Sequence, residues 1–161
     1  MCNNVYEVSS CPVPVNQRAR AGNLPEWFYE RICDYAENST SEGRESAIQH
    51  LSRILGRSCI RNGNQLRISP ELKTFFFRNA FRCFLAAAKA LAKTDYDVFA
   101  GIRPAPAFQA ALSGLNESYE DLRDIYIYIR EDDVLMPLER WLRSADLSRP
   151  FYIGGTIEYH C

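Results

Sequence analysis

The 161-residue sequence lacks the short motifs by which many enzyme families are recognised. It contains no nucleophile elbow, no P-loop, no dinucleotide-binding glycine pattern and no histidine pair at zinc-protease spacing. Its two histidines, His50 and His160, belong to no paired motif with a cysteine or a carboxylate. The sequence therefore predicts a protein that is not an enzyme and has no catalytic residues.

Cysteine pairs and metal-ligand spacings are missing as well. The six cysteines include no CxxC pair and no ligand spacing with either histidine. A chain of this length with 47% hydrophobic residues buries a core without disulfides. We therefore expect free thiols and no metal. The cysteines are Cys2, Cys11, Cys33, Cys59, Cys83 and Cys161.

Long apolar runs are also absent, since none approaches the ~20 residues that a bilayer-spanning helix needs. The polar N-terminus, MCNNVYEVSS, lacks the basic and apolar regions of a signal peptide. We therefore expect a soluble, cytoplasmic protein that is not inserted in a membrane.

Two neighbouring stretches have opposite charge: the first has few acidic residues and the second has few basic residues. Residues 44–93 contain ten Lys and Arg against two acidic residues, whereas residues 94–139 contain ten Asp and Glu against three Arg. Arginine outnumbers lysine 16 to 3, which suits bidentate ion pairs at interfaces. The two blocks can face each other within the fold or across a subunit contact, so we expect a protein partner, self or other. Nucleic-acid binding is the less favoured interpretation.

Residues 69–94 have the pattern of one long, almost entirely apolar helix. Ser69 is a good N-cap, Pro70 suits the first helical position, and no breaker follows before Lys93. Four cations fall within about 60° of one another at 100° per residue. They are Arg78, Arg82, Lys89 and Lys93. Because the rest of the surface is apolar, we expect a buried helix at about 70–93 with only this basic edge uncovered.

Shorter signals predict the remaining elements of what we expect to be a single domain over residues 1–161. NSTSEG supplies caps for a helix that ends near Leu55, before Gly56. Asn62-Gly63 favours a hairpin, although a plain loop is the alternative. Three other stretches are assigned from local pattern: an irregular segment at 1–22, a strand or helix at 124–130, and a small hairpin at 151–160.

The spacing after Cys83 is similar to that of a known family. Leu91, Tyr96 and Ala100-Gly101 follow at 8, 13 and 17–18 residues, and GLNESYEDL occupies 114–122. Residues 69–122 thus resemble the phycobiliproteins, the globin-fold light-harvesting subunits of phycobilisomes. In that family the bilin-carrying cysteine is followed by the same residue types.

This resemblance implies a mainly α, globin-like bundle around the helix at 70–93. It also implies a photosynthetic light-harvesting role with a linear tetrapyrrole on Cys83, whose propionates would meet Arg78 and Arg82. The family's Arg and Asp after the cysteine are replaced by Leu85 and Ala86. An antenna-associated protein without chromophore is therefore the other implied form. The alternative fold is α+β, with small hairpins near 58–68 and 151–160.

A second hypothesis comes from a different functional class. The absence of a catalytic set and the positively charged block favour a small inhibitor or interaction protein of phage or plasmid type. It would dock through an Arg-rich face on a nucleic-acid-handling complex. Its expected contact residues are Arg61, Arg67, Arg78, Arg82, Lys89 and Lys93.

Overall fold

The computed structural model describes residues 3–120 and 123–161, so Cys2 and the last two residues of GLNESYEDL lie outside the described residues. The chain forms two compact units, Met1–Leu72 with Arg123–Cys161 (unit 1) and Lys73–Leu122 (unit 2). Unit 1 contains a seven-stranded mixed sheet with helices, whereas unit 2 is helical. The mainly α, globin-like bundle was therefore a wrong prediction, and the fold is α+β.

The sheet of unit 1 has the order β3-β4-β7-β1-β5-β6, and β2 also pairs with β7. The central strand β1 runs parallel to β5 and antiparallel to β7. The strands are β1 (Asn3–Ser9), β2 (Tyr35–Asn38), β3 (Cys59–Asn62), β4 (Gln65–Ile68), β5 (Ile125–Ile129), β6 (Val134–Pro137) and β7 (Phe151–His160).

The strands confirm some local predictions and correct others. The hairpin near 58–68 is β3–β4, with Gly63 at φ 60° in its two-residue turn. The segment 1–22 is not irregular throughout, because β1 lies at the sheet centre. The hairpin predicted at 151–160 was wrong, since β7 continues through Gly154-Gly155 as one strand. Residues 124–130 contain a strand, β5.

Three helices belong to unit 1: α1 (Glu26–Arg31), α2 (Ser41–Leu55) and α7 (Leu138–Ser144). Short 3-10 turns occupy Val15–Gln17, Ala21–Asn23 and Gly56–Ser58. The predicted end of α2 at Leu55 is confirmed, whereas its start at Ser41 lies inside the NSTSEG stretch that was expected to be a loop. The Thr40 hydroxyl accepts a hydrogen bond from Gly43 N at 3.0 Å, and Gly56 follows the helix at φ 64°.

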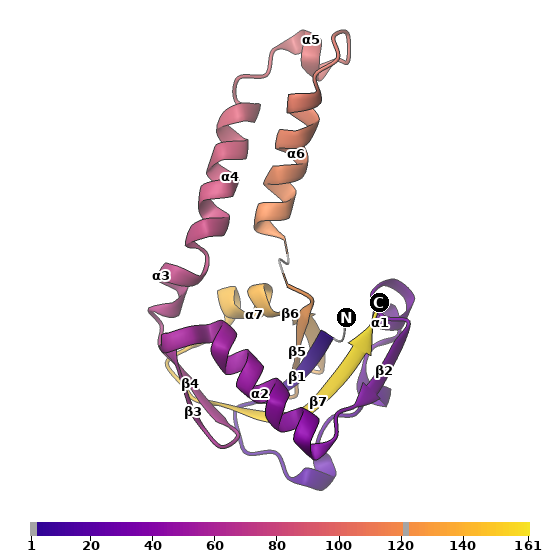
Figure 1. Cartoon of the computed structure of the whole chain (residues 1–161), viewed down its shortest axis with the longest axis vertical. Helices are drawn as coiled ribbons and strands as arrows, with labels where there is room; N and C mark the ends of the chain where they lie inside the picture. The colour runs from indigo at the N-terminus through magenta and orange to yellow at the C-terminus, as the bar shows by residue number, and fades with distance from the viewer. Residues whose placement is uncertain (1–2, 121–122) are drawn as a thin grey trace. The chain divides into compact units, whose positions relative to one another are not determined.

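Side chains alternate between the two sheet faces and build a core on each. On one face, the fully buried ring of Phe28 from α1 packs against Tyr159 at 5.1 Å, beside Val5 and Ile157. On the other, the Tyr6 hydroxyl donates to the Ala47 carbonyl of α2 at 3.0 Å, and α2 lies across the strands (Figure 1).

Unit 2 contains α4 (Arg78–Leu91) and α6 (Pro106–Tyr119), which lie side by side (Figure 1), together with α5 (Tyr96–Phe99). The helix α3 (Leu72–Phe76) precedes α4, and Phe77 between them leaves helical geometry at φ −93°, ψ 0°. The single buried helix at 70–93 was therefore a wrong prediction. It is two helices, and α4 contains no buried residue.

The packing of α4 on α6 explains why so apolar a helix is only partly covered. A Cβ added at Gly114 of α6 would lie 3.9 Å from the Ala87 Cβ of α4, so small side chains let the backbones approach closely. The partly buried residues of α4 lie on this side, whereas Phe81 and Leu85 are exposed. Among the described residues, no helix has the length and apolar character needed to cross a membrane.

Candidate functional site

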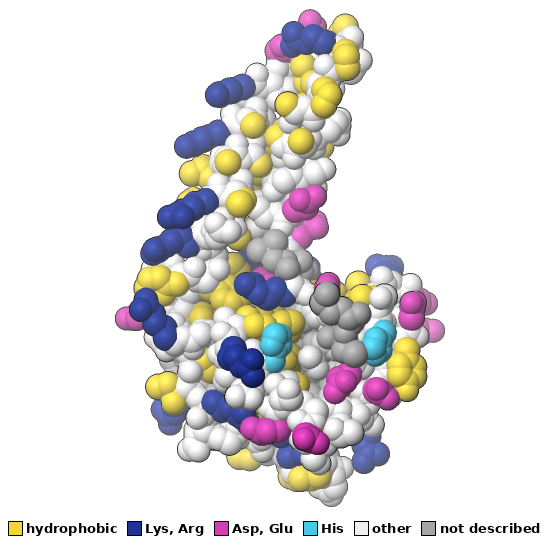
Figure 2. Space-filling view, in the orientation of Figure 1, with side chains coloured by type: hydrophobic (Ala, Val, Ile, Leu, Met, Phe, Trp, Pro, Cys, Tyr) yellow, Lys and Arg dark blue, Asp and Glu magenta, His cyan; other side chains and the backbone are white. Residues whose placement is uncertain are grey.

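A row of cations runs along α4 and into the turn that follows it. Arg78, Arg82, Lys89 and Lys93 are all exposed, and Figure 2 shows Lys and Arg side chains lining one edge of this helix. Arg78 also lies over the Phe75 ring, 5.2 Å from its centroid. No acidic residue occurs from Leu72 to Lys93 in the sequence, so the row has no counter-charge within its own stretch of chain.

Two exposed apolar side chains belong to the same side of α4. At 100° per residue, Phe81 and Leu85 lie about 60° and 20° from Arg78 on the side away from Lys93. Their exposed fractions are 60% and 39%. We call this set of six residues the α4 stripe: Arg78, Phe81, Arg82, Leu85, Lys89 and Lys93. Apolar side chains among arginines are the composition typical of protein interface centres.

The turn between α4 and α6 displays further apolar side chains. Tyr96, Phe99 and Ile102 are 70–76% exposed. The turn is held locally, because the Asp95 carboxylate caps Val98 N at 3.0 Å and pairs with Arg103. Fourteen large hydrophobic residues are exposed among the described residues, and eight of them lie in unit 2. Its surface is therefore unusually apolar for so small a unit.

The two other predicted contact residues belong to unit 1. Arg61 pairs with Glu45 at 2.6 Å and donates to the Gly63 carbonyl at 2.8 Å, so its charge is compensated locally. Arg67 lines a cavity of about 440 Å³ together with Arg57 and Arg149. The predicted contact set thus divides between the α4 stripe and β3–β4.

The predicted bilin residues do not share one side of a helix. Cys83 is exposed on α4 and lies about 140° around the helix from Arg78 and about 100° from Arg82. The structure thus places the candidate anchor and its candidate propionate partners on different sides of α4. The bilin assignment stays a prediction based on sequence spacing.

Alkylation of the native chain provides a test of the exposure of α4. We expect iodoacetamide to modify Cys83 at the rate of a free thiol. Cys33, which is 3% exposed and whose pKa is raised mainly by burial, should react about 100-fold more slowly until the chain unfolds. Peptide mass spectrometry over time measures both rates. Equal protection of the two thiols would contradict the exposed position of Cys83.

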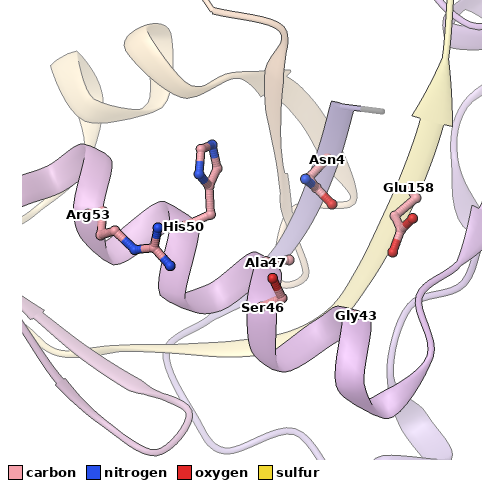
Figure 3. A pocket seen from close by; sticks show the side chains of 7 residues that line it. All are labelled: Asn4, Gly43, Ser46, Ala47, His50, Arg53 and Glu158. Carbon is pink, nitrogen blue, oxygen red and sulfur yellow. The ribbon is translucent and has the colours of Figure 1, made fainter. Parts of the chain in front are cut away.

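A polar cavity of about 330 Å³ lies between α2 and the sheet (Figure 3). Ser46 and His50 of α2 line it together with Asn4 of β1 and Glu158 of β7. These residue types occur in hydrolytic sites, but within residues 3–120 and 123–161 no hydrogen bond joins the serine, histidine and glutamate. A hydroxyl without an adjacent base is a weak nucleophile. The described residues also contain no group of three or more potential metal ligands.

Sequence reasoning missed a second group of polar residues at the start of α2, among them Arg18, Ser39, Arg44 and Thr156. They come from three distant segments, so no local motif joins them. Comparisons with models of protein families, with curated proteins and with solved structures found no match.

Proposed function

We propose that this chain is a non-enzymatic interaction protein that docks through the α4 stripe onto an acidic surface of another protein. The observation that carries the proposal is the row of four exposed cations, interrupted by exposed Phe81 and Leu85. A nucleic-acid-handling complex, the partner expected from the sequence, is one candidate. The proposal itself needs only a partner with an acidic surface.

The length and charge of the stripe support specific docking. From Arg78 to Lys89 the helix rises about 17 Å at 1.5 Å per residue, so the stripe extends along three turns of α4. Four cations on one edge attract a complementary negative potential and raise the association rate. Binding should therefore weaken as salt increases, because exposed charges are screened within about 10 Å at 0.1 M salt.

The apolar members of the stripe favour a protein over nucleic acid as the partner. Contacts to a phosphate backbone need cations, and their affinity comes mainly from counterion release. Exposed Phe81 and Leu85 add nothing to such contacts, whereas buried aromatic and arginine side chains dominate the energy of protein interfaces. The exposed turn residues Tyr96, Phe99 and Ile102 extend the apolar surface that a protein partner would cover.

Site-specific photo-cross-linking in the native host tests this proposal. Benzoylphenylalanine replaces Phe81 in the stripe or, as a matched control, Tyr35 of β2, an aromatic residue that is 57% exposed. We expect position 81 to give one adduct of defined mass that resists nuclease, and position 35 not to give it. Mass spectrometry of the adduct identifies the partner, whose contact surface should be acidic.

Three outcomes would contradict the proposal. They are the same adducts at positions 81 and 35, an adduct at position 81 that nuclease removes, and no adduct at position 81. The second outcome would instead favour direct nucleic-acid binding. Circular dichroism of both proteins before irradiation checks that each variant has folded.

A further inference from the structure

A cavity of about 260 Å³ lies in unit 1 where three segments meet. The segment around Arg18, the start of α2 and the middle of β7 each contribute to its lining. Ser41, the first residue of the 15-residue helix α2, lies at its wall, so the positive end of the helix dipole faces this region. The cavity is distinct from the α4 stripe and plays no part in the proposed docking.

Three residues that line this cavity carry buried polar atoms without hydrogen-bond partners. Four such side-chain atoms occur among the described residues, and three of them belong to residues that line it. They are Arg18 Nε, Ser39 Oγ and Thr156 Oγ1. Thr156 is only 4% exposed, and its register opposite Tyr6 places it on the α2 face of the sheet. Because buried polar groups almost always have a hydrogen-bond partner, three donors left unpaired indicate a missing acceptor.

Two arginines leave the cavity with positive charge. Arg44 donates to the carbonyls of Gly154 at 2.8 Å and Ile153 at 2.7 Å, and to Asn64 Oδ1 at 2.9 Å. Its partners are thus neutral. Burial, followed by the nearby Arg18 cation, holds the pKa of Arg44 below its usual value. Both arginines line the same cavity.

The neighbouring carboxylate makes its hydrogen bonds to other groups. Glu7 is 1% exposed, and its Oε1 accepts from Arg130 at 2.6 Å. Its Oε2 accepts from Ala19 N at 2.7 Å and Gly155 N at 2.6 Å. Glu7 is therefore hydrogen-bonded to Arg130 and the backbone and not to Arg18 or Arg44.

We propose that this cavity binds the phosphoryl group of a small phosphorylated molecule. The hydroxyls of Ser39 and Thr156 and the guanidinium of Arg18 would donate to its oxygens, while Arg44 and the α2 dipole supply further positive potential. A phosphoryl group suits these donors because it presents several strong acceptor oxygens in a tetrahedral arrangement. The volume leaves room for a few attached carbon atoms.

Titration of the full chain with inorganic phosphate and with glycerol 3-phosphate tests the inference. Sodium chloride at matched ionic strength is the control. We expect saturable binding in calorimetry and a rise in the melting temperature that chloride does not give. Tighter binding of glycerol 3-phosphate would identify a phosphorylated small molecule, whereas equal binding would point to free phosphate as the occupant.

Thr156→Val separates ligand binding from a structural role, because valine keeps the shape and removes only the hydroxyl. We expect phosphate affinity to fall about tenfold, while the melting temperature without phosphate stays equal or rises. Ser39→Ala and Arg18→Gln should weaken binding similarly. Arg53→Gln, outside the cavity, should not.

Two results would overturn the inference. Phosphate that stabilises the chain no more than chloride would exclude the site. Unchanged phosphate affinity in Thr156→Val, Ser39→Ala and Arg18→Gln would place any binding elsewhere. Should Thr156→Val fail to fold, the other two variants still decide between these results.

Discussion

Glu7→Gln is expected to lower the free energy of unfolding by about 2 kcal/mol, because it removes the charge of a buried carboxylate that pairs with the partly exposed Arg130 and accepts two backbone hydrogen bonds. The carboxylate accepts three hydrogen bonds, from Arg130 and from the backbone of Ala19 and Gly155. Glutamine has the same shape, but its NH₂ group would face a donor at one of these positions. A buried donor would then lose its acceptor. Urea unfolding followed by circular dichroism measures the change.

Glu45→Gln is the matched control for this prediction. Glu45 pairs with Arg61 at 2.6 Å, but its side chain is 64% exposed. Solvent-exposed pairs contribute little, so this variant should unfold almost as the parent does. If both variants unfolded at the same urea concentration, Glu7 would not hold the segment around Ala19 against β7.

Gly155→Ala is expected to destabilise the chain by about 3 kcal/mol through overpacking. A Cβ at this position would overlap the Ala19 carbonyl oxygen, which is backbone and has no flexible end to move aside. The added methyl group would displace the segment around Ala19 and disturb the cavity that Arg18 and Thr156 line. Thermal unfolding with and without phosphate measures both effects.

Gly22→Ala provides the comparison, because a Cβ there would meet nothing within 4 Å. We expect this variant to keep the melting temperature of the parent. A Gly155→Ala protein as stable as Gly22→Ala would mean that the close approach of Ala19 to β7 does not exist in solution.

Local signals in the sequence predicted the elements that local interactions determine. Thr40 and Gly56 stand at the two ends of α2. They could be predicted because N-caps and left-handed glycines act within one turn of the helix. Asn62-Gly63 predicted the β3–β4 hairpin because the conformation of a tight turn depends on the few residues in it. Elements that depend on distant partners were missed. Gly154-Gly155 resembles a turn locally, yet glycine is needed there because Glu7 and Ala19 approach β7 closely.

The same distinction applies to the candidate sites. Arg78, Arg82 and Lys89 belong to one helix, so the sequence predicted their common edge, whereas Lys93 lies two residues beyond the end of α4. Burial of that helix depends on how many neighbours it has, and α4 packs side by side with α6. The cavity near Arg18 and Thr156 joins residues more than 130 positions apart, which no spacing in a single sequence reveals.

Cross-link yield at position 81 in two charge-matched variants tests the docking proposal most directly. Arg82→Glu with Lys89→Glu reverses two cations of the α4 stripe, whereas Arg31→Glu with Arg53→Glu reverses two exposed cations of unit 1. The proposal predicts that the first pair lowers the yield at least about tenfold and that the second leaves it near the parental value. Equal yields from the two variants would contradict docking through the α4 stripe.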